Sequence, residues 1–413
     1  MIDDDGDPVH MNARGPLQGL RVLEFGQIAA GPFTGSLLAD LGADVVKVER
    51  PDGGDGMRNW PPLSAENGGK AYSENFASLN RNKRSIAVDL KDAASIARLR
   101  DLVREIDVLV ENFRPGVLGR LGLGYEDLKA VNPQLVYCSI SGYGQTGPYA
   151  KRGAFDVTVQ GMSGLMSVTG EEGGAPVKAG VPFGDFCAGL YAAYAIAAAL
   201  LEARRSGEGA FIDCSMLGSL IGVAALQTSE YFGTGKVPKP LGSAHPRNAP
   251  YQAFAASDDY FIIAAGNDRL WQEVAEAVGL AELADDPRFA TQADRARNQK
   301  ILVEILAPRF AERTAKEWMD EMDRRGVPFS PINNYDQTLS DPQVEAMNLV
   351  RRLRLPNGVE TRTTAFPVSM TGYAFDIRRQ PPELGEHTEE VFEEWLGSSQ
   401  IEPAMKRKTR GPY

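Results

Sequence analysis

Five short apolar segments recur between residues 20 and 140, and segments of helical character separate them. The apolar segments are LRVLEF (20–25), ADVVKVE (43–49), SIAVDL (85–90), DVLVENF (107–113) and QLVYCSI (134–140). A helix is expected to open at Pro32, which suits the first helical turn, and to end at Gly42, and residues 92–105 are periodic like a second helix. Strands that alternate with helices of this length predict a parallel α/β sheet with right-handed crossovers.

The later part of the chain changes character twice. The expected elements are helices at 154–168, 186–205 and 217–232 and a strand at 211–216. The predicted organisation is a flexible tail (1–14), a large α/β domain (15–232), a linker (233–250), a small α+β domain (251–326), a return segment with the C-terminal part of the large domain (327–400), and a basic tail (401–413). The small domain carries a hairpin signal around Asp258-Asp259 and amphipathic helices. The stretch VPFSPINN (327–334) is expected to be irregular.

The charge balance limits the partners of this 413-residue chain. Lys and Arg number 44 against 55 Asp and Glu, which gives a net charge of -11. A protein that coats nucleic acid needs a broadly basic surface, so we expect no nucleic-acid partner. A local basic pocket for a phosphorylated ligand remains compatible with this balance.

The cysteines and the apolar segments indicate a cytoplasmic location. Cys138, Cys187 and Cys214 lie far apart, without metal-ligand spacing, and predict core residues in a reducing compartment without disulfides or a bound metal. The acidic start lacks the positive charge and apolar run of a signal peptide. The apolar stretch 186–201 is too short for a comfortable membrane span, so we expect a buried core helix and no membrane association.

Ligands of parallel α/β sheets bind in the loops after the carboxyl ends of the strands. The loop GQIAAG is neither a dinucleotide fingerprint nor a phosphate-gripping P-loop, which disfavours a nicotinamide dehydrogenase. Basic, amide and aromatic residues are concentrated in these loops instead: Arg50, Arg81, Lys83, Arg84, Asn112, Phe113, Arg114 and Arg120. Such density suits an anionic ligand with several phosphates, because arginine forks grip oxygen atoms. Loop arginines that are simply solvated remain the alternative.

Asp185 is the most unusual carboxylate of the chain. It lies between Gly184 and a long apolar segment, at the expected N-terminus of a helix. A helix N-cap is the ordinary explanation for such a residue. A covalent nucleophile is the other, and Gly184 and Gly189 would let a substrate approach closely. The histidines lie apart from other catalytic residue types, and no G-x-S-x-G motif predicts a hydrolase.

From residue 16 to about 395 the sequence resembles the class III CoA-transferases, the CaiB/BaiF family. The resemblance is carried by GLRVLEFGQIAAGPF, LGADVVKVERPDGGD, SLNRNKRSIAVDLK, DVLVENFRPGVLGRLGLGYEDL, SISGYGQTGPY, QGMSGLMSVTG, GVPFGDFCAGLYA, HPRNAPYQAF, GVPFSPINN and LGEHTEEV. It implies a large Rossmann-like domain built from both chain ends, a small central domain, and two chains interlocked as an obligate homodimer. The motif set is most similar to enzymes that transfer CoA from succinyl-CoA to dicarboxylic acids.

The resemblance also implies site residues. The family nucleophile falls on Asp185, which would form an aspartyl anhydride and then an aspartyl-CoA thioester. The CoA contacts fall on Ile28, Ala30, Arg50, Lys83, Asn112, Phe113 and Arg120. The implied substrates are an acyl-CoA and a free carboxylic acid, with no tightly bound cofactor.

Two other functions are compatible with parts of this sequence. An α-methylacyl-CoA racemase uses a His in a G-H-D motif, and the corresponding segment here is GAFD (153–156), which places Phe155 at the His position. A phenyl ring exchanges no proton, so the racemase is disfavoured. A CoA-binding protein without turnover is disfavoured because Asp185 is retained. A second carboxylate on the substrate would need a cation, for which Arg58, Arg152 and Arg247 are candidates.

Overall fold

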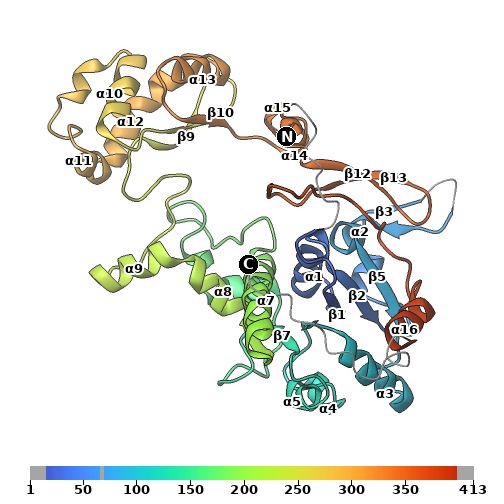
Figure 1. Ribbon diagram of the computed structural model, residues 1–413. Coiled ribbons are helices and arrows are strands. Elements are labelled where there is room, and N and C mark those ends of the chain that lie inside the picture. The colour runs from blue at the N-terminus through green and yellow to red at the C-terminus, as the bar shows by residue number, and fades with distance from the viewer. Residues whose placement is uncertain (1–14, 66–68, 398–413) are drawn as a thin grey trace. The chain divides into compact units, whose positions relative to one another are not determined.

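The computed structural model describes residues 15–65 and 69–397, and the two expected tails lie outside this part of the chain. Its largest sheet has six strands in the order β5-β2-β1-β6-β7-β8 (Figure 1). All pairs in this sheet are parallel. The strands are β1 (Arg21–Phe25), β2 (Asp44–Glu49), β5 (Lys83–Ala87), β6 (Val108–Glu111), β7 (Val136–Ser141) and β8 (Ala210–Ser215). The predicted parallel α/β sheet is therefore confirmed.

One predicted strand is displaced. Strand β5 begins at Lys83, because Lys83 pairs with Val45 and Arg84 with Val46 of β2. The expected strand began at residue 85 and left both cations in a loop. Their position inside the sheet changes their role, as described below.

Helices follow or precede these strands as the alternation predicts. They are α1 (Ala30–Asp40), α2 (Glu74–Asn80), α3 (Ala93–Leu102), α4 (Val117–Arg120), α5 (Tyr125–Lys129), α6 (Asp156–Met162), α7 (Phe183–Ser206), α8 (Met216–Val223), α9 (Ala225–Thr234) and α16 (Thr388–Gly397). The expected helices 154–168 and 217–232 are each divided, the second at Ala224 between α8 and α9. Small antiparallel pairs are formed by β3 (Leu63–Ser64) with β4 (Tyr72–Ser73) and by β12 (Val350–Arg354) with β13 (Glu360–Thr364).

Helix α7 is long and apolar enough to cross a membrane by length and composition alone, a test that core helices of soluble proteins also pass. One side packs on α1 and on strands β7 and β8. The other side exposes apolar residues, among them Tyr194 and Leu201 at 75% and 71% exposure. The expected buried core helix is thus only half correct.

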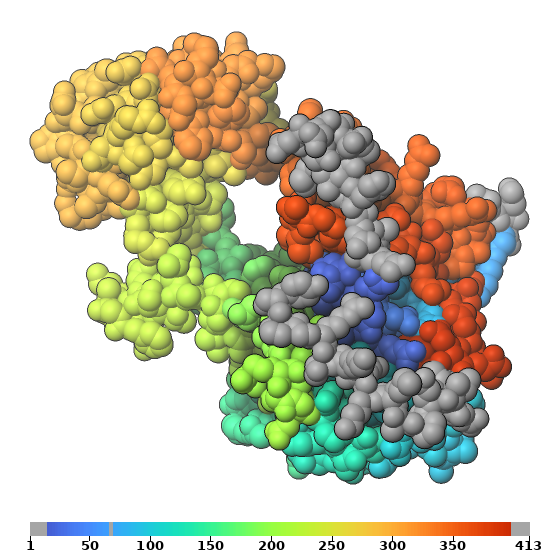
Figure 2. All heavy atoms as spheres, viewed as in Figure 1, coloured from blue at the N-terminus to red at the C-terminus, as the bar shows by residue number. Residues whose placement is uncertain are grey.

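The described chain forms two compact units: residues 15–163, 180–228 and 345–397, and residues 164–179 and 229–344. In the first, α16 inserts the fully buried Trp395 into the apolar cluster beside the sheet. Figure 2 shows orange-red atoms of the C-terminal segment beside blue atoms of the N-terminal strands. The hydrogen bond from His387 N to Ser85 O, at 2.9 Å, joins the same parts of the chain.

The second unit is α+β. Its sheet has the order β11-β10-β9, with β9 (Tyr251–Ala255), β10 (Tyr260–Ala264) and β11 (Phe329–Pro331). Its helices are α10 (Asp268–Ala277), α11 (Gln292–Arg297), α12 (Gln299–Phe310), α13 (Ala315–Arg324) and α14 (Tyr335–Leu339), and α15 (Pro342–Ala346) spans the boundary. The stretch expected to be irregular contains β11, because Ser330 pairs with Ile262 of β10. This pairing extends the unit beyond residue 326.

Candidate functional site

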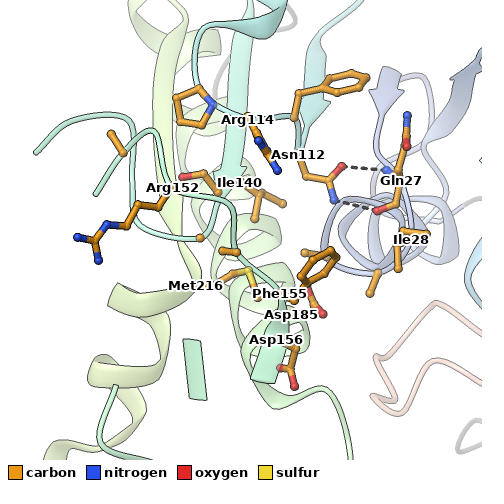
Figure 3. Close-up of a pocket in the computed structure, with 18 residues that line it drawn as sticks. Gln27, Ile28, Asn112, Arg114, Ile140, Arg152, Phe155, Asp156, Asp185 and Met216 are labelled. Atoms are coloured by element: carbon orange, nitrogen blue, oxygen red, sulfur yellow. Dashed lines mark hydrogen bonds between the residues drawn. The ribbon is translucent and has the colours of Figure 1, made fainter. Parts of the chain in front are cut away.

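A cavity of about 220 Å³ lies where the carboxyl ends of β1, β6 and β7 come together in the first unit. It is lined by 27–30 after β1, 112–115 after β6, 140–142 at the end of β7, five residues of 150–156, and Asp185 and Met216 (Figure 3). Ligands of parallel α/β sheets bind at this edge. A cavity thus lies at the edge that strand order indicated, and ligand binding there stays a prediction.

Asp185 is the third residue of α7. The N-cap of this helix is Pro182, so the ordinary N-cap explanation for Asp185 is wrong. Burial, and next the charge of Asp156, raise the pKa of Asp185 to about 6. The carboxylate is therefore ionised near neutral pH and is more basic than an ordinary aspartate.

Asp156, at the start of α6, is the neighbour that sequence analysis missed. Its Oδ1 accepts a hydrogen bond from the backbone N–H of Gly184 at 2.7 Å. Its Oδ2 accepts from Gln160 Nε2 at 2.6 Å. Both carboxylates line the cavity. The only local signal for Asp156 in the sequence is its place in the segment GAFD.

Of the two glycines near Asp185, Gly189 has a different role from the expected one. A Cβ on Gly184 would lie 3.1 Å from Asp156 Oδ1. A Cβ on Gly189 would lie 2.7 Å from the ring of Phe33 on α1. Gly189 therefore allows close packing of α7 on α1, whereas the sequence suggested access for a substrate.

Four of the seven expected CoA contacts line the cavity: Ile28, Ala30, Asn112 and Phe113. The side chain of Asn112 receives a hydrogen bond from Gln27 N at 2.8 Å and donates one to Gln27 O at 2.9 Å (Figure 3). Arg50 and Arg120 are exposed and stand outside the cavity lining. The Nε of Arg50 donates to Gly54 O at 3.1 Å.

Lys83 has a different place from the expected one. Its side chain is fully buried, and its ammonium donates to Glu24 Oε2 (2.7 Å), Pro32 O (2.7 Å) and Asn80 Oδ1 (3.1 Å). Burial and the nearby Lys47 ammonium lower the pKa of Lys83 to about 8, against the attraction of Glu24. In this structure Lys83 presents no surface to a ligand.

The neighbouring cations Arg81 and Arg84 are also paired inside the protein. Arg81 contacts Asp40 at 2.5 Å. Arg84 pairs with Glu390 and Glu394 of α16 at 3.0 and 2.6 Å. The cations of LNRNKRS are therefore paired with carboxylates inside the protein, and the phosphate-binding interpretation of this segment is wrong.

Of the three candidate cations for a second carboxylate, only Arg152 lines the cavity. Its guanidinium carbon lies 3.8 Å from the ring centroid of Tyr149. Arg58 is held by Glu49 through two hydrogen bonds of 2.7 and 2.6 Å. Arg247 pairs with Glu230 at 3.1 Å in the second unit.

Comparison with known proteins adds a consistent set of relatives. A family profile described as CoA-transferase family III matches residues 17–388. The chain is 40% identical over 385 residues to a succinate–glutarate CoA-transferase of Agrobacterium fabrum, which covers 93% of this chain and 96% of that one. It is 39% identical over 387 residues to the human succinyl-CoA:glutarate CoA-transferase, with 94% and 87% covered. The crystal structure of a CaiB/BaiF family protein from Brucella suis superposes with a TM-score of 0.82 at 41% identity and covers 92% of this chain and 100% of that one.

Proposed function

The chain belongs to CoA-transferase family III, and we propose that Asp185 is the covalent nucleophile of its reaction. The observation that carries this proposal is the position of Asp185 in the cavity, on the first turn of α7, with a pKa raised to about 6. A carboxylate of this basicity is ionised at pH 7 and is a better nucleophile than an ordinary aspartate. The positive end of the α7 dipole favours its charged form.

Four exchanges complete the proposed reaction. The Asp185 carboxylate attacks the carbonyl carbon of the donor thioester, and the carbon–sulfur bond breaks to release CoA thiolate and leave a mixed anhydride. The thiolate attacks the aspartyl carbonyl and expels the donor carboxylate, which leaves an aspartyl-CoA thioester. The acceptor carboxylate attacks that thioester and expels the thiolate, which then attacks the acceptor carbonyl and frees Asp185. No proton is gained or lost, and water must stay out because each intermediate hydrolyses.

Phe155 supports transfer over racemisation. Its side chain lines the cavity and is 79% exposed, at the position where a racemase would hold its histidine. A racemase needs proton exchange on both faces of the α-carbon, and a phenyl ring supplies none.

For substrates, we propose that the acyl group of the donor thioester and the free acceptor acid both derive from dicarboxylic acids. Succinyl-CoA is the proposed donor. The two relatives named above carry succinate or succinyl-CoA and glutarate in their names. Arg114 and Arg152 are the cations that line the cavity, and we propose that one of them pairs with the second carboxylate. The proposed CoA contacts in the cavity are Ile28, Ala30, Asn112 and Phe113. Two further proposed contacts, Arg50 and Arg120, are exposed and lie outside the cavity lining.

We also propose that the active form is an interlocked homodimer. The exposed apolar side of α7 supports this proposal, since a contiguous apolar patch on a soluble protein marks an interaction site. Leu190, Tyr194 and Leu201 contribute to it.

The test of the proposed function is substrate exchange followed by mass. The protein is incubated with a panel of acyl-CoA donors and free acids, and every CoA ester is identified by mass spectrometry. We expect acid-dependent transfer that is greatest with dicarboxylic pairs. Hydrolysis without transfer to any acid would contradict the proposal.

A further inference from the structure

Ile28 adopts a backbone conformation that its side chain disfavours. Its φ is 63°, in the left-handed region, which β-branched residues rarely adopt. Such strain persists only where the surroundings fix the backbone, and it is concentrated at functional sites. Ile28 lies in the loop that lines the cavity with Asp185.

Asp55 holds this strained residue directly. Its two carboxylate oxygens accept the backbone N–H of Ile28 at 3.1 and 3.2 Å. The Asp55 carboxylate is paired at 2.9 Å with the ammonium of Lys47. Lys47 in turn donates to Gly26 O, two residues before Ile28, at 2.6 Å. The Asp55–Lys47 pair therefore binds the loop backbone at two positions, Gly26 and Ile28.

Glu24 joins this pair to Lys83. Its Oε1 lies 3.0 Å from Lys47 and its Oε2 lies 2.7 Å from Lys83, which also holds Pro32 O on α1. The side chains of Glu24, Lys47, Asp55 and Lys83 are buried. A Cβ on Gly35 would collide with Glu24, so α1 has no side chain where the network passes.

Stability alone gives a poor account of such a network. Replacing buried ion pairs by packed apolar residues is often neutral or stabilising, because burial of charge is unfavourable. The network instead constrains the backbone conformation of residues 26–32, through hydrogen bonds to Gly26, Ile28 and Pro32. Helix α1 begins within this segment, and its N-cap Ala29 makes no side-chain hydrogen bond to the first turn. Ala29 and Ala30, with which α1 begins, both line the cavity, so the path of the loop sets where they lie.

We propose that Asp55, supported by Lys47, is a positioning residue for CoA transfer: it holds Ile28 in the left-handed conformation and thereby sets the loop opposite Asp185. This inference rests on the proposed transferase function of the cavity. Asp55 touches no substrate and acts through the backbone of Ile28.

The test is a set of double-variant comparisons. Asp55→Ala is made in the wild type, in Ile28→Gly and in Ile28→Ala, and kcat, KM and the urea unfolding midpoint are measured for each pair. Glycine adopts positive φ without strain, whereas alanine loses the side chain of Ile28 but keeps the strain. Ile28→Ala is therefore the matched control for Ile28→Gly.

We expect Asp55→Ala to lower kcat by about 30-fold or more in the wild type and in Ile28→Ala, because the loop relaxes away from its active path. In Ile28→Gly the loss should stay below about fivefold, because glycine adopts positive φ without steric cost and the active path stays accessible when Asp55 is lost. The effect of Asp55→Ala on the urea unfolding midpoint should rank the three backgrounds in the opposite order to its effect on kcat. Its drop should be largest in Ile28→Gly, since there no strain is released when Asp55 is lost.

Equal losses of kcat and equal midpoint shifts in all three backgrounds would overturn the inference. They would assign Asp55 only to the cap that it forms on the short 3₁₀ helix Gly56–Asn59 and to charge balance. Where Asp55→Ala does not fold, Asp55→Asn replaces it. The asparagine amide cannot pair with the Lys47 ammonium, so the same three backgrounds are compared: a kcat loss that is larger in the wild type and in Ile28→Ala than in Ile28→Gly supports positioning, and equal losses contradict it. If the wild type transfers no CoA, the proposed function fails, and the order of the midpoints alone decides the inference.

Discussion

Asp156 Oδ1 and the backbone N–H of Gly184 are joined by a hydrogen bond of 2.7 Å, which places a second carboxylate beside the residue that precedes Asp185. This contact fixes the start of α7 on the start of α6. It also brings a negative charge close enough to raise the pKa of Asp185, together with burial. One residue therefore both positions the proposed nucleophile and increases its basicity.

Asp185→Asn should abolish transfer while CoA still binds, because the amide keeps the shape but lacks the attacking oxygen anion. Transfer is measured by mass, and Asp101→Asn on the surface of α3 is the control. Hydroxylamine added after the donor should convert Asp185 to a hydroxamate, which peptide mapping locates. Transfer within tenfold of wild type, or a hydroxamate on another residue, would assign the nucleophile elsewhere.

The acid limb of kcat/KM should lie near pH 6, because this parameter reports the free enzyme and Asp185 must be ionised to attack. Asp156→Asn removes the neighbouring charge and should move the limb to lower pH. Its amide oxygen still accepts from Gly184, so the position of α7 is preserved. A limb that stays in place after this change would show that Asp156 does not tune Asp185.

The free energy of unfolding should also depend on pH through the raised pKa of Asp185. Between the unfolded pKa of 3.8 and the folded value of about 6, the folded state holds a proton that the unfolded state has released. Folding stability due to Asp185 is therefore full below 3.8 and is lost as pH rises through 6. Asp185→Asn should raise the free energy of unfolding at pH 8 by up to about 3 kcal/mol, at about 1.4 kcal/mol per pKa unit.

This gain should shrink on going to pH 4.5, because the folded wild type is by then mostly protonated at Asp185 and carries little buried charge there. Urea unfolding at the two pH values measures it. A gain of the same size at both values would attribute it to packing.

Arg50→Ala should weaken CoA binding by at least about tenfold, the effect of losing one cation that contacts phosphate (about 1.4 kcal/mol). Isothermal titration with CoA measures the change. Arg104→Ala, at an exposed position before β6, is the control and should bind as the wild type does. An unchanged Kd for Arg50→Ala would return Arg50 to the class of solvated loop arginines.

The enzyme should leave the α-carbon of a chiral 2-methylacyl-CoA intact, since Phe155 stands where a racemase needs its histidine. Incubation in heavy water without an acid acceptor, followed by polarimetry and mass, tests this. Deuterium uptake with loss of optical rotation would identify a racemase with another base.

The residue pattern singled out Asp185, Asn112 and Phe113 because their signals are local, whereas Ile28 and Ala30 came only from the family resemblance. A glycine–aspartate pair before an apolar helix and polar residues after buried strands can be read within a few positions. Asp156 was missed because its partner Gly184 is 28 residues away and the contact exists only once α6 meets α7.

Lys83 was placed wrongly for a related reason. A run of cations reads as solvated unless the acids that pair with them are known to be near. Glu24, which neutralises Lys83, is 59 residues earlier in the chain, and strand pairing of β5 through β2 to β1 brings the two together. The register that buries Lys83 depends on this pairing and on no local pattern.

The contact between β5 and α16 has a consequence for synthesis on the ribosome. Ser85 and His387 are 302 residues apart in the chain, and Arg84 finds two of its carboxylates only on α16. The nascent sheet must therefore wait, with one edge uncovered and Trp395 absent from its core, while the whole second unit is translated. Folding rates fall with such separation, and uncovered strands aggregate. Expression of this protein should consequently depend on chaperones during elongation, and ribosome stalling before residue 388 should leave the nascent chain sensitive to protease.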